Sequence, residues 1–194
     1  MRTSHLLYLH GFRSSPRSAK AVRMAEWTKA HRPDLRFVAP QLPPSPAQAV
    51  RQLEEITHGW PRESSALMGS SLGGFYATVM GERLGCRTVL LNPAIDPARD
   101  LAAYIGEQSC WQDPAEHFFF RPEYVDELRA LTPGALTQPE RYFAVIAKGD
   151  EVLDWREMHA RYAESKVLLL ERSDHGLSDF DQHLPAVMDF LELA

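Results

Sequence analysis

Short apolar runs alternate along the chain with longer stretches of helical periodicity. Each apolar run is hydrophobic on both faces, which is typical of a strand buried inside a parallel sheet. Strands connected through helices predict a parallel sheet with helices on both faces. The predicted strands are 6–9, 36–39, 65–68, 88–91, 142–147 and 166–170, and the predicted helices are 18–31, 47–58, 73–84, 155–163 and 179–193.

Two segments interrupt this alternation. The proline-rich segment 40–46 predicts a rigid loop, because proline neither donates to a strand ladder nor continues a helix. The longer segment, 96–140, is too long for an ordinary unstructured loop. We expect it to form a small helical cap over the strand ends, with a helix at 122–131. Residues 1–194 would then form a single α/β domain with a cap insertion at 96–140.

Composition and charge exclude several classes of partner. The chain has 194 residues, 44% hydrophobic and 24% charged, which fits one globular domain. A net charge of −5 offers no basic surface for nucleic acid or an anionic bilayer. No apolar run reaches the roughly 20 residues of a membrane span. The apolar run 6–9 is too short for the core of a signal peptide. We expect no nucleic-acid partner, no membrane span and a cytoplasmic location.

Metal and cofactor chemistry has little support in the sequence. Cys86 and Cys110 have no spacing that would hold zinc, and we expect two free thiols in a reducing compartment. Asp174 and His175 have no third ligand at a usable spacing. Phosphate-binding glycine motifs after a strand are also missing from the sequence. We therefore expect neither a metal nor a cofactor.

A glycine-rich segment follows the third predicted strand and precedes a helix. It reads GSSLGG at 69–74, with Ser71 flanked at −2 and +2 by Gly69 and Gly73. This is the pattern of a nucleophile elbow, a strained strand-to-helix turn that exposes a serine hydroxyl above a sheet. The alternative is an ordinary tight turn of small residues. The strand before it and the helix after it favour the elbow.

A nucleophilic serine needs a histidine to accept its proton and a carboxylate to orient that histidine. On α/β-hydrolase folds the acid and then the histidine follow the serine, each after a late strand. Asp150 and His175 occupy those positions. Asp96 and Asp154 also follow strands, and we interpret them as a turn residue and a helix N-cap, respectively.

Ester hydrolysis also needs backbone donors for the negative oxygen that develops on the substrate. One is normally the N–H after the nucleophile, here that of Leu72. The loop after the first strand contains His10, Gly11 and Phe12. We expect the N–H of Phe12 to be the second donor and the His10 ring to be structural.

The sequence resembles the YqiA-like esterases, which are small bacterial α/β-hydrolases. The resemblance covers most of the chain and rests on LYLHGF at 7–12, SSPRSAK at 14–20, PQLPP at 40–44, GSSLGGFYAT at 69–78, NPA at 92–94 and GDEVLD at 149–154. It implies an α/β-hydrolase fold and a serine esterase acting on small-molecule esters of short acyl groups, with acyl-CoA thioesters as a further substrate class. It also implies that Asp150 is the acid.

Segment 96–140 matches this family least well, and it is where we expect the substrate to be selected. We predict that Trp111, Phe118 and Phe119 contact the acyl group, since an acyl chain requires apolar contacts. The alternative is that these rings only pack the cap onto the sheet. Two other functions remain open. Ser71, Asp150 and His175 could instead hydrolyse amides or peptides, and a non-catalytic relative could use the fold to bind a ligand.

Overall fold

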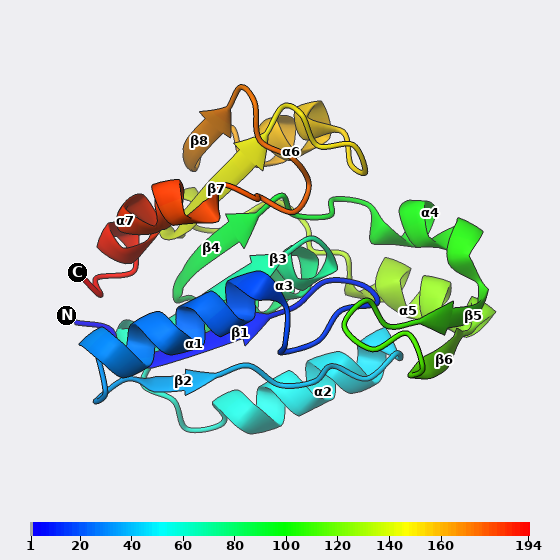
Figure 1. Ribbon diagram of the computed structural model, residues 1–194, viewed down its shortest axis with the longest axis horizontal. Coiled ribbons are helices and arrows are strands. Elements are labelled where there is room, and N and C mark those ends of the chain that lie inside the picture. Colours follow the sequence, from blue (N-terminus) through cyan, green and yellow to red (C-terminus); the bar gives the residue numbers. More distant parts are fainter. Residues whose placement is uncertain (1) are drawn as a thin grey trace.

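A six-stranded sheet, parallel throughout, lies at the centre of the computed structural model, which describes residues 2–194 (Figure 1). All six predicted strands are present, and the largest difference is that β3 continues to Ser70. The strand order is β2-β1-β3-β4-β7-β8. The strands are β1 (His5–Leu9), β2 (Arg36–Val38), β3 (Ser65–Ser70), β4 (Arg87–Leu91), β7 (Tyr142–Ala147) and β8 (Lys166–Leu170).

Helices cover both faces of the sheet, as the sequence predicts. Because successive side chains of a strand point to opposite faces, β1 contributes Leu6 and Tyr8 to one core and Leu7 and Leu9 to the other. The first core is covered by α1 (Ala19–His31) and α7 (Phe180–Phe190), which ends three residues earlier than predicted. The second is covered by α2 (Pro46–Thr57), α3 (Leu72–Leu84) and α6 (Trp155–Arg161).

Two short segments differ slightly from expectation. Pro46 begins α2 instead of ending the proline-rich loop, because proline suits the first helical position and the Ser45 hydroxyl accepts from the Gln48 N–H. A 3-10 turn, η1 (Arg62–Ser64), precedes β3. Neither changes the order of the sheet.

The order in which strands are added to the sheet reverses at β1. From β1 the chain crosses to β2 on one side and then to β3 on the other. In open parallel sheets, ligands bind in the crevice at such a switch point, beyond the carboxyl ends of the strands. Leu9 of β1 pairs with Gly69 of β3. The loops that follow these two strands therefore start side by side.

Segment 96–140 corrects one expectation, because the cap is not purely helical. Between its helices lies an antiparallel hairpin, which the aromatic run Phe118–Phe120 favours through its strand propensity. The predicted helix at 122–131 is present (Figure 1). In chain order the segment contains α4 (Pro97–Leu101), η2 (Ala102–Tyr104), β5 (Gly106–Ser109), β6 (His117–Phe120), α5 (Pro122–Leu131) and η3 (Pro139–Arg141).

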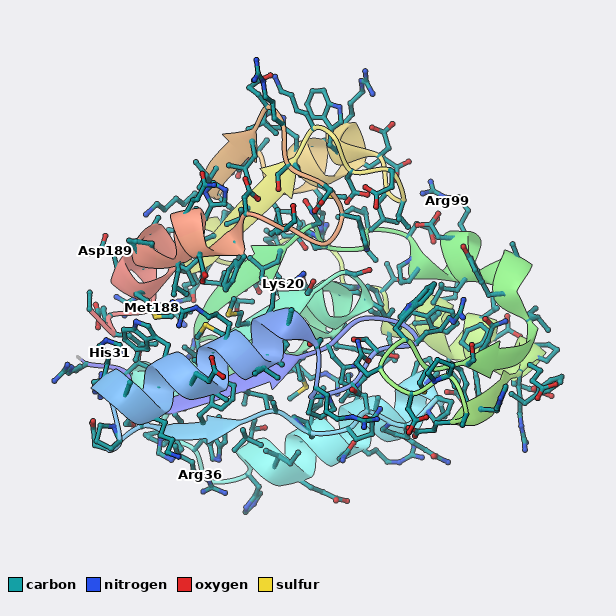
Figure 2. All side chains as sticks on the ribbon, viewed as in Figure 1. Lys20, His31, Arg36, Arg99, Met188 and Asp189 are labelled. Carbon is teal, nitrogen blue, oxygen red and sulfur yellow. The ribbon has the colours of Figure 1, made fainter. Side chains whose placement is uncertain are left out.

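Polar contacts attach this segment to the rest of the domain. Arg99 of α4 binds Glu157 of α6 through both terminal nitrogens, at 2.8 Å each (Figure 2). Within residues 2–194, no helix combines the length and apolar character needed to cross a membrane. Cys86 and Cys110 are both free and buried.

Candidate active site

Ser71 occupies a strained turn between β3 and α3. Its φ of 56° and ψ of −122° are rare for a residue with a side chain, and such strain persists only where the surroundings enforce it. The Ser71 N–H donates to the Leu91 carbonyl at 3.0 Å. The Ser71 carbonyl accepts from Gly74 and Ala94, at 2.8 and 3.0 Å. The turn is thus held by the neighbouring strand β4 and the loop after it.

The two predicted elbow glycines are required by close backbone approach. A β-carbon on Gly69 would overlap the carbonyl of Gly73, and one on Gly73 would overlap the carbonyl of Leu9. Helix α3 can therefore start directly over the ends of β1 and β3 only if both positions lack side chains.

Three of the predicted residues form one hydrogen-bonded chain. His175 Nε2 lies 3.1 Å from Ser71 Oγ, and His175 Nδ1 lies 2.7 Å from Asp150 Oδ2. The Asp150 side chain is fully buried, and the His175 side chain is 21% exposed. Because an ionised carboxylate only accepts, Nδ1 carries the proton, which leaves Nε2 free to accept one from the serine.

The Asp150 carboxylate is fixed by further donors, whereas the two competing aspartates cap helices. Asp150 Oδ1 accepts from the N–H groups of Val152 and Leu153, at 2.8 Å each. Asp96 accepts from the N–H of Arg99 at 3.1 Å, and Asp154 from that of Arg156 at 2.9 Å. Asp154 thus caps α6 as interpreted from the sequence, whereas Asp96 caps α4 instead of serving a turn.

Asn92 organises the loop after β8 that contains His175, residues 173–176, which we call the histidine loop. The sequence analysis missed this role. The Asn92 side chain is completely buried, with a left-handed φ of 42°. The amide nitrogen donates to the carbonyls of Asp174 and His175, at 3.0 and 3.1 Å, and the amide oxygen accepts from Ala147 N–H at 2.8 Å. An asparagine directly after a buried strand and before a proline was the available signal, because asparagine tolerates the left-handed region.

Two charged side chains also hold the histidine loop. Lys20 of α1 donates to the carbonyl of Gly176 (Figure 2). Burial lowers the pKa of Lys20, and the charge of Asp174 opposes that shift. Glu151 accepts from the His175 N–H at 3.0 Å. The imidazole is therefore positioned from the backbone side as well as by Asp150.

The loop after β1 lies directly against the serine. A β-carbon on Gly11 would be 3.2 Å from Ser71 Cβ and 3.7 Å from Ser71 Oγ. The N–H groups of Phe12 and Leu72 do not donate to any backbone carbonyl within residues 2–194. Both predicted oxyanion donors therefore belong to segments in contact with Ser71, and both amides are free to bind a substrate oxygen.

His10 connects this loop to the proline-rich segment. The ring is 4% exposed, Nδ1 bonds the Gly11 carbonyl at 2.9 Å, and Nε2 accepts from the Leu42 N–H at 3.0 Å. Burial lowers the pKa of His10, and the bond to Gly11 opposes that shift. The expectation that His10 is structural agrees with these contacts.

A cavity of about 400 Å³ adjoins the loop after β1, residues 10–13, which contains Phe12 and which we call the oxyanion loop. Of the three rings predicted to contact the acyl group, Phe118 lines this cavity, whereas Trp111 and Phe119 lie outside it and are 64% and 57% exposed. The reason is the hairpin. Alternate residues of β6 point to opposite sides, so Phe118 and Phe120 share the cavity side and Phe119 points away. Trp111 instead lies beneath the Arg13 guanidinium, 4.1 Å from the ring centroid.

Residues 2–194 contain no group of three or more histidine, cysteine, aspartate or glutamate side chains placed to hold a metal ion. What the site contains is a serine aligned with an imidazole, a buried carboxylate behind it, free amides on two sides and an adjoining apolar cavity. Such an arrangement is able to perform acyl transfer.

Solved structures with the same fold include several hydrolases. Mouse alpha/beta hydrolase domain-containing protein 10 aligns with a TM-score of 0.72 and 15% identity, covering 98% of this chain and 91% of that one. A structure of LipS and LipT, two metagenome-derived lipolytic enzymes, aligns with a TM-score of 0.72 and 16% identity, covering 100% and 96%. Est1E from Butyrivibrio proteoclasticus with ferulic acid bound aligns with a TM-score of 0.65 and 12% identity, covering 98% and 87%. These likenesses establish the α/β-hydrolase fold.

Sequence comparison identifies the family. A UPF0227 protein of Yersinia pseudotuberculosis is 25% identical to this chain, and the alignment covers 97% of this chain and 99% of the relative. The model of the uncharacterised protein family UPF0227 matches residues 5–192. The chain therefore belongs to the uncharacterised protein family UPF0227.

Proposed function

We propose that the protein is a serine esterase that hydrolyses carboxylic esters of short acyl groups through an acyl-enzyme. The observation that carries this proposal is the hydrogen-bonded chain from Ser71 through His175 to Asp150, at 3.1 and 2.7 Å. The resemblance to YqiA-like esterases supports it, as does the fold shared with lipolytic enzymes and with Est1E. Acyl-CoA thioesters, which react through the same intermediate, are a second substrate class.

In the acylation step, Ser71 Oγ attacks the ester carbonyl while His175 Nε2 takes the hydroxyl proton. The carbonyl oxygen becomes negative and accepts from the N–H groups of Leu72 and Phe12. Asp150 keeps the proton of the other ring nitrogen in place and stabilises the imidazolium. The C–O bond of the ester then breaks, and His175 returns its proton to the leaving alcohol.

In the deacylation step, water replaces the alcohol. His175 removes a proton from the water, which attacks the acyl carbonyl through a second negative intermediate held by the same two amides. Collapse of that intermediate releases the carboxylic acid and returns the proton to Ser71. No cofactor is needed for either step.

Substitution of Ser71 tests the proposal. Ser71→Ala should fold normally and lose on the order of 10⁴-fold or more in kcat on p-nitrophenyl butyrate. Ser70→Ala, at the neighbouring buried position, is the matched control and should stay within a few-fold of wild type. Activity of Ser71→Ala within tenfold of wild type would remove Ser71 as the nucleophile.

Two further measurements separate the alternatives. A fluorophosphonate should label wild type but not Ser71→Ala, whereas a non-catalytic binding protein would not be labelled. Matched ester and amide substrates with the same acyl group distinguish an esterase from an amidase. Because His175 is the proposed general base, His175→Ala should abolish the activity with both substrates.

A further inference from the structure

The cavity beside the oxyanion loop has two zones. Its rim is exposed and polar, with Gln41, Glu116 and His117. Its inner lining is buried and largely apolar, with Leu42, Leu72, Tyr76, Cys110 and Phe120, each less than 9% exposed. Phe12 packs edge-on against Phe118 and Phe120, at centroid distances of 5.8 and 5.3 Å. The inner zone therefore offers aromatic edges and aliphatic surface to the part of a substrate that enters it.

Tyr76 interrupts this apolar lining with an unpartnered hydroxyl. Only 2% of the residue's surface is exposed, and its phenol oxygen has no hydrogen-bond partner among residues 2–194. That oxygen is not one of the fully enclosed unpaired atoms, so it remains accessible from the cavity. Burial raises the pKa of Tyr76 and the charge of Glu127 raises it further, so the phenol stays protonated and can donate. Buried hydroxyls normally find a partner. The other buried polar ring of the lining, His10, has both its nitrogens bonded.

Gln52 of α2 supplies a second polar group to the same cavity. Its side-chain oxygen is buried and has no hydrogen-bond partner among residues 2–194. Oxygen and nitrogen of a glutamine amide can exchange places by rotation, so this group can either accept or donate. Two side chains from adjacent helices therefore leave unused hydrogen-bonding capacity in one cavity.

The position of Tyr76 relative to the reaction centre follows from helix geometry. Tyr76 and Leu72 are four residues apart on α3, so they lie on one face of the helix, about 6 Å apart along its axis. Leu72 supplies an expected oxyanion donor at the helix start. A group that runs from the oxyanion site along this face meets apolar contacts first and the Tyr76 hydroxyl about one turn further in.

We infer that this cavity binds the acyl group of the substrate, and that this acyl group has an apolar, aromatic body with a terminal hydroxyl that hydrogen-bonds to Tyr76 and Gln52. The inference rests on the proposed esterase function and specifies its substrate class. A wholly apolar acyl group of the same size would leave both polar groups without partners, which disfavours it. Sites that hydrogen-bond a substrate hydroxyl discriminate strongly against analogues that lack it.

Matched esters test this inference directly. The probes are p-nitrophenyl esters of 3-(4-hydroxyphenyl)propanoate and 3-(4-methylphenyl)propanoate, which are similar in size but differ in the terminal hydrogen-bonding group. Wild type should hydrolyse the hydroxy ester with a kcat/KM at least tenfold higher. In Tyr76→Phe and in Gln52→Leu this ratio should fall to within about threefold of one. Equal kcat/KM values in wild type, or an unchanged ratio in both variants, would overturn the inference.

Tyr162→Phe is the matched control for loss of a buried tyrosine hydroxyl. Tyr162 is also 2% exposed, but its hydroxyl is paired with Thr78 at 2.8 Å, outside the cavity. The variant should keep the wild-type ratio. If Tyr76→Phe does not fold, Gln52→Leu and the wild-type ratio decide the question.

Failure of the inference is distinguishable from failure of the proposed function. If both esters are hydrolysed equally and Ser71→Ala hydrolyses neither, the esterase function stands and the hydroxylated substrate class is wrong. If wild type hydrolyses neither ester and is not labelled by a fluorophosphonate, the esterase function itself is wrong.

Discussion

The side chain of Asn92 donates a hydrogen bond to the backbone carbonyl of His175 across 83 residues of sequence. The distance is 3.1 Å, and the same amide also binds the carbonyl of Asp174 and the N–H of Ala147. The loop that carries the expected general base is thus attached to the ends of two sheet strands, β4 and β7, through one buried side chain.

Asn92→Asp should disable this attachment. The substitution replaces the donating NH₂ with an oxygen that faces two carbonyl oxygens, which leaves buried groups unpaired at a typical cost of about 1–3 kcal/mol each. We expect a lower melting temperature and at least a hundredfold loss of kcat. Activity and thermal unfolding of the variant should be measured together. A stable variant with wild-type kcat would show that Asn92 does not position His175.

The buried His10 predicts a pH dependence of stability. Its pKa is lowered in the folded protein, chiefly by burial, so the unfolded chain binds a proton near pH 6.5 while the folded chain does not. More protons bound in the unfolded state means that stability falls as pH decreases through that region. Urea unfolding at pH 7.5 and 5.5 should show this fall in wild type. His10→Asn should be less stable at pH 7.5 and show a smaller fall, and an equal fall would assign the effect to other groups.

Three aspartates follow strands, and their contacts predict different effects of amide substitution. Asp150→Asn should lose on the order of 10⁴-fold in kcat, because the amide favours the wrong tautomer of His175. Asp154→Asn should cost little, since asparagine caps a helix about as well as aspartate. The same is expected of Asp96→Asn. If Asp150→Asn keeps its activity while one of the other variants loses it, the acid is misassigned.

Arg13 connects the oxyanion loop to the cap hairpin. It has a left-handed φ of 59°, and its guanidinium binds the Ser109 carbonyl at 2.8 Å and the Ser109 hydroxyl at 3.0 Å. Arg13→Ala removes these bonds while keeping the cost of the left-handed backbone, whereas Arg13→Gly removes the bonds and that cost.

We therefore expect kcat to fall about tenfold or more in Arg13→Ala and less in Arg13→Gly. Affinity for a trifluoromethyl ketone, which forms an oxyanion with Ser71, should fall in parallel with kcat. Arg17→Ala is the control, because within residues 2–194 the Arg17 guanidinium forms only long, exposed ion pairs, with Asp113 and Glu116. Identical kcat values for all three variants would show that Arg13 does not position the oxyanion donor, the N–H of Phe12.

Neighbouring phenylalanines on β6 should behave differently, because they point to opposite sides of the hairpin. Phe118→Ala enlarges the cavity and should shift the preference among p-nitrophenyl esters of graded length towards longer acyl groups. Phe119→Ala removes an exposed ring and should leave that preference near wild type. A loss of stability in Phe118→Ala without any change in preference would favour a purely structural role for the ring.

Local patterns in the sequence were enough to predict the strands of the sheet, the elbow and the chain order of Ser71, Asp150 and His175. These features depend on short-range chemistry. A strand buried on both faces must be apolar throughout, and a turn that brings α3 onto β1 must have glycine at 69 and 73. Asp154 could also be interpreted locally, because a capping side chain binds an amide only a few residues away.

The composition of the cap and the contacts that cross the domain depend on how distant segments of the chain pack together. The run Phe118–Phe120 suits a helix or a strand, and pairing with β5 fixed which rings face the cavity. The hydrogen bonds of Asn92 could not be predicted, because its partners, Asp174 and His175, are brought to it by the order of the sheet. The unpartnered hydroxyl of Tyr76 had no signal in the sequence either, because a hydroxyl lacks a partner only with respect to the whole fold.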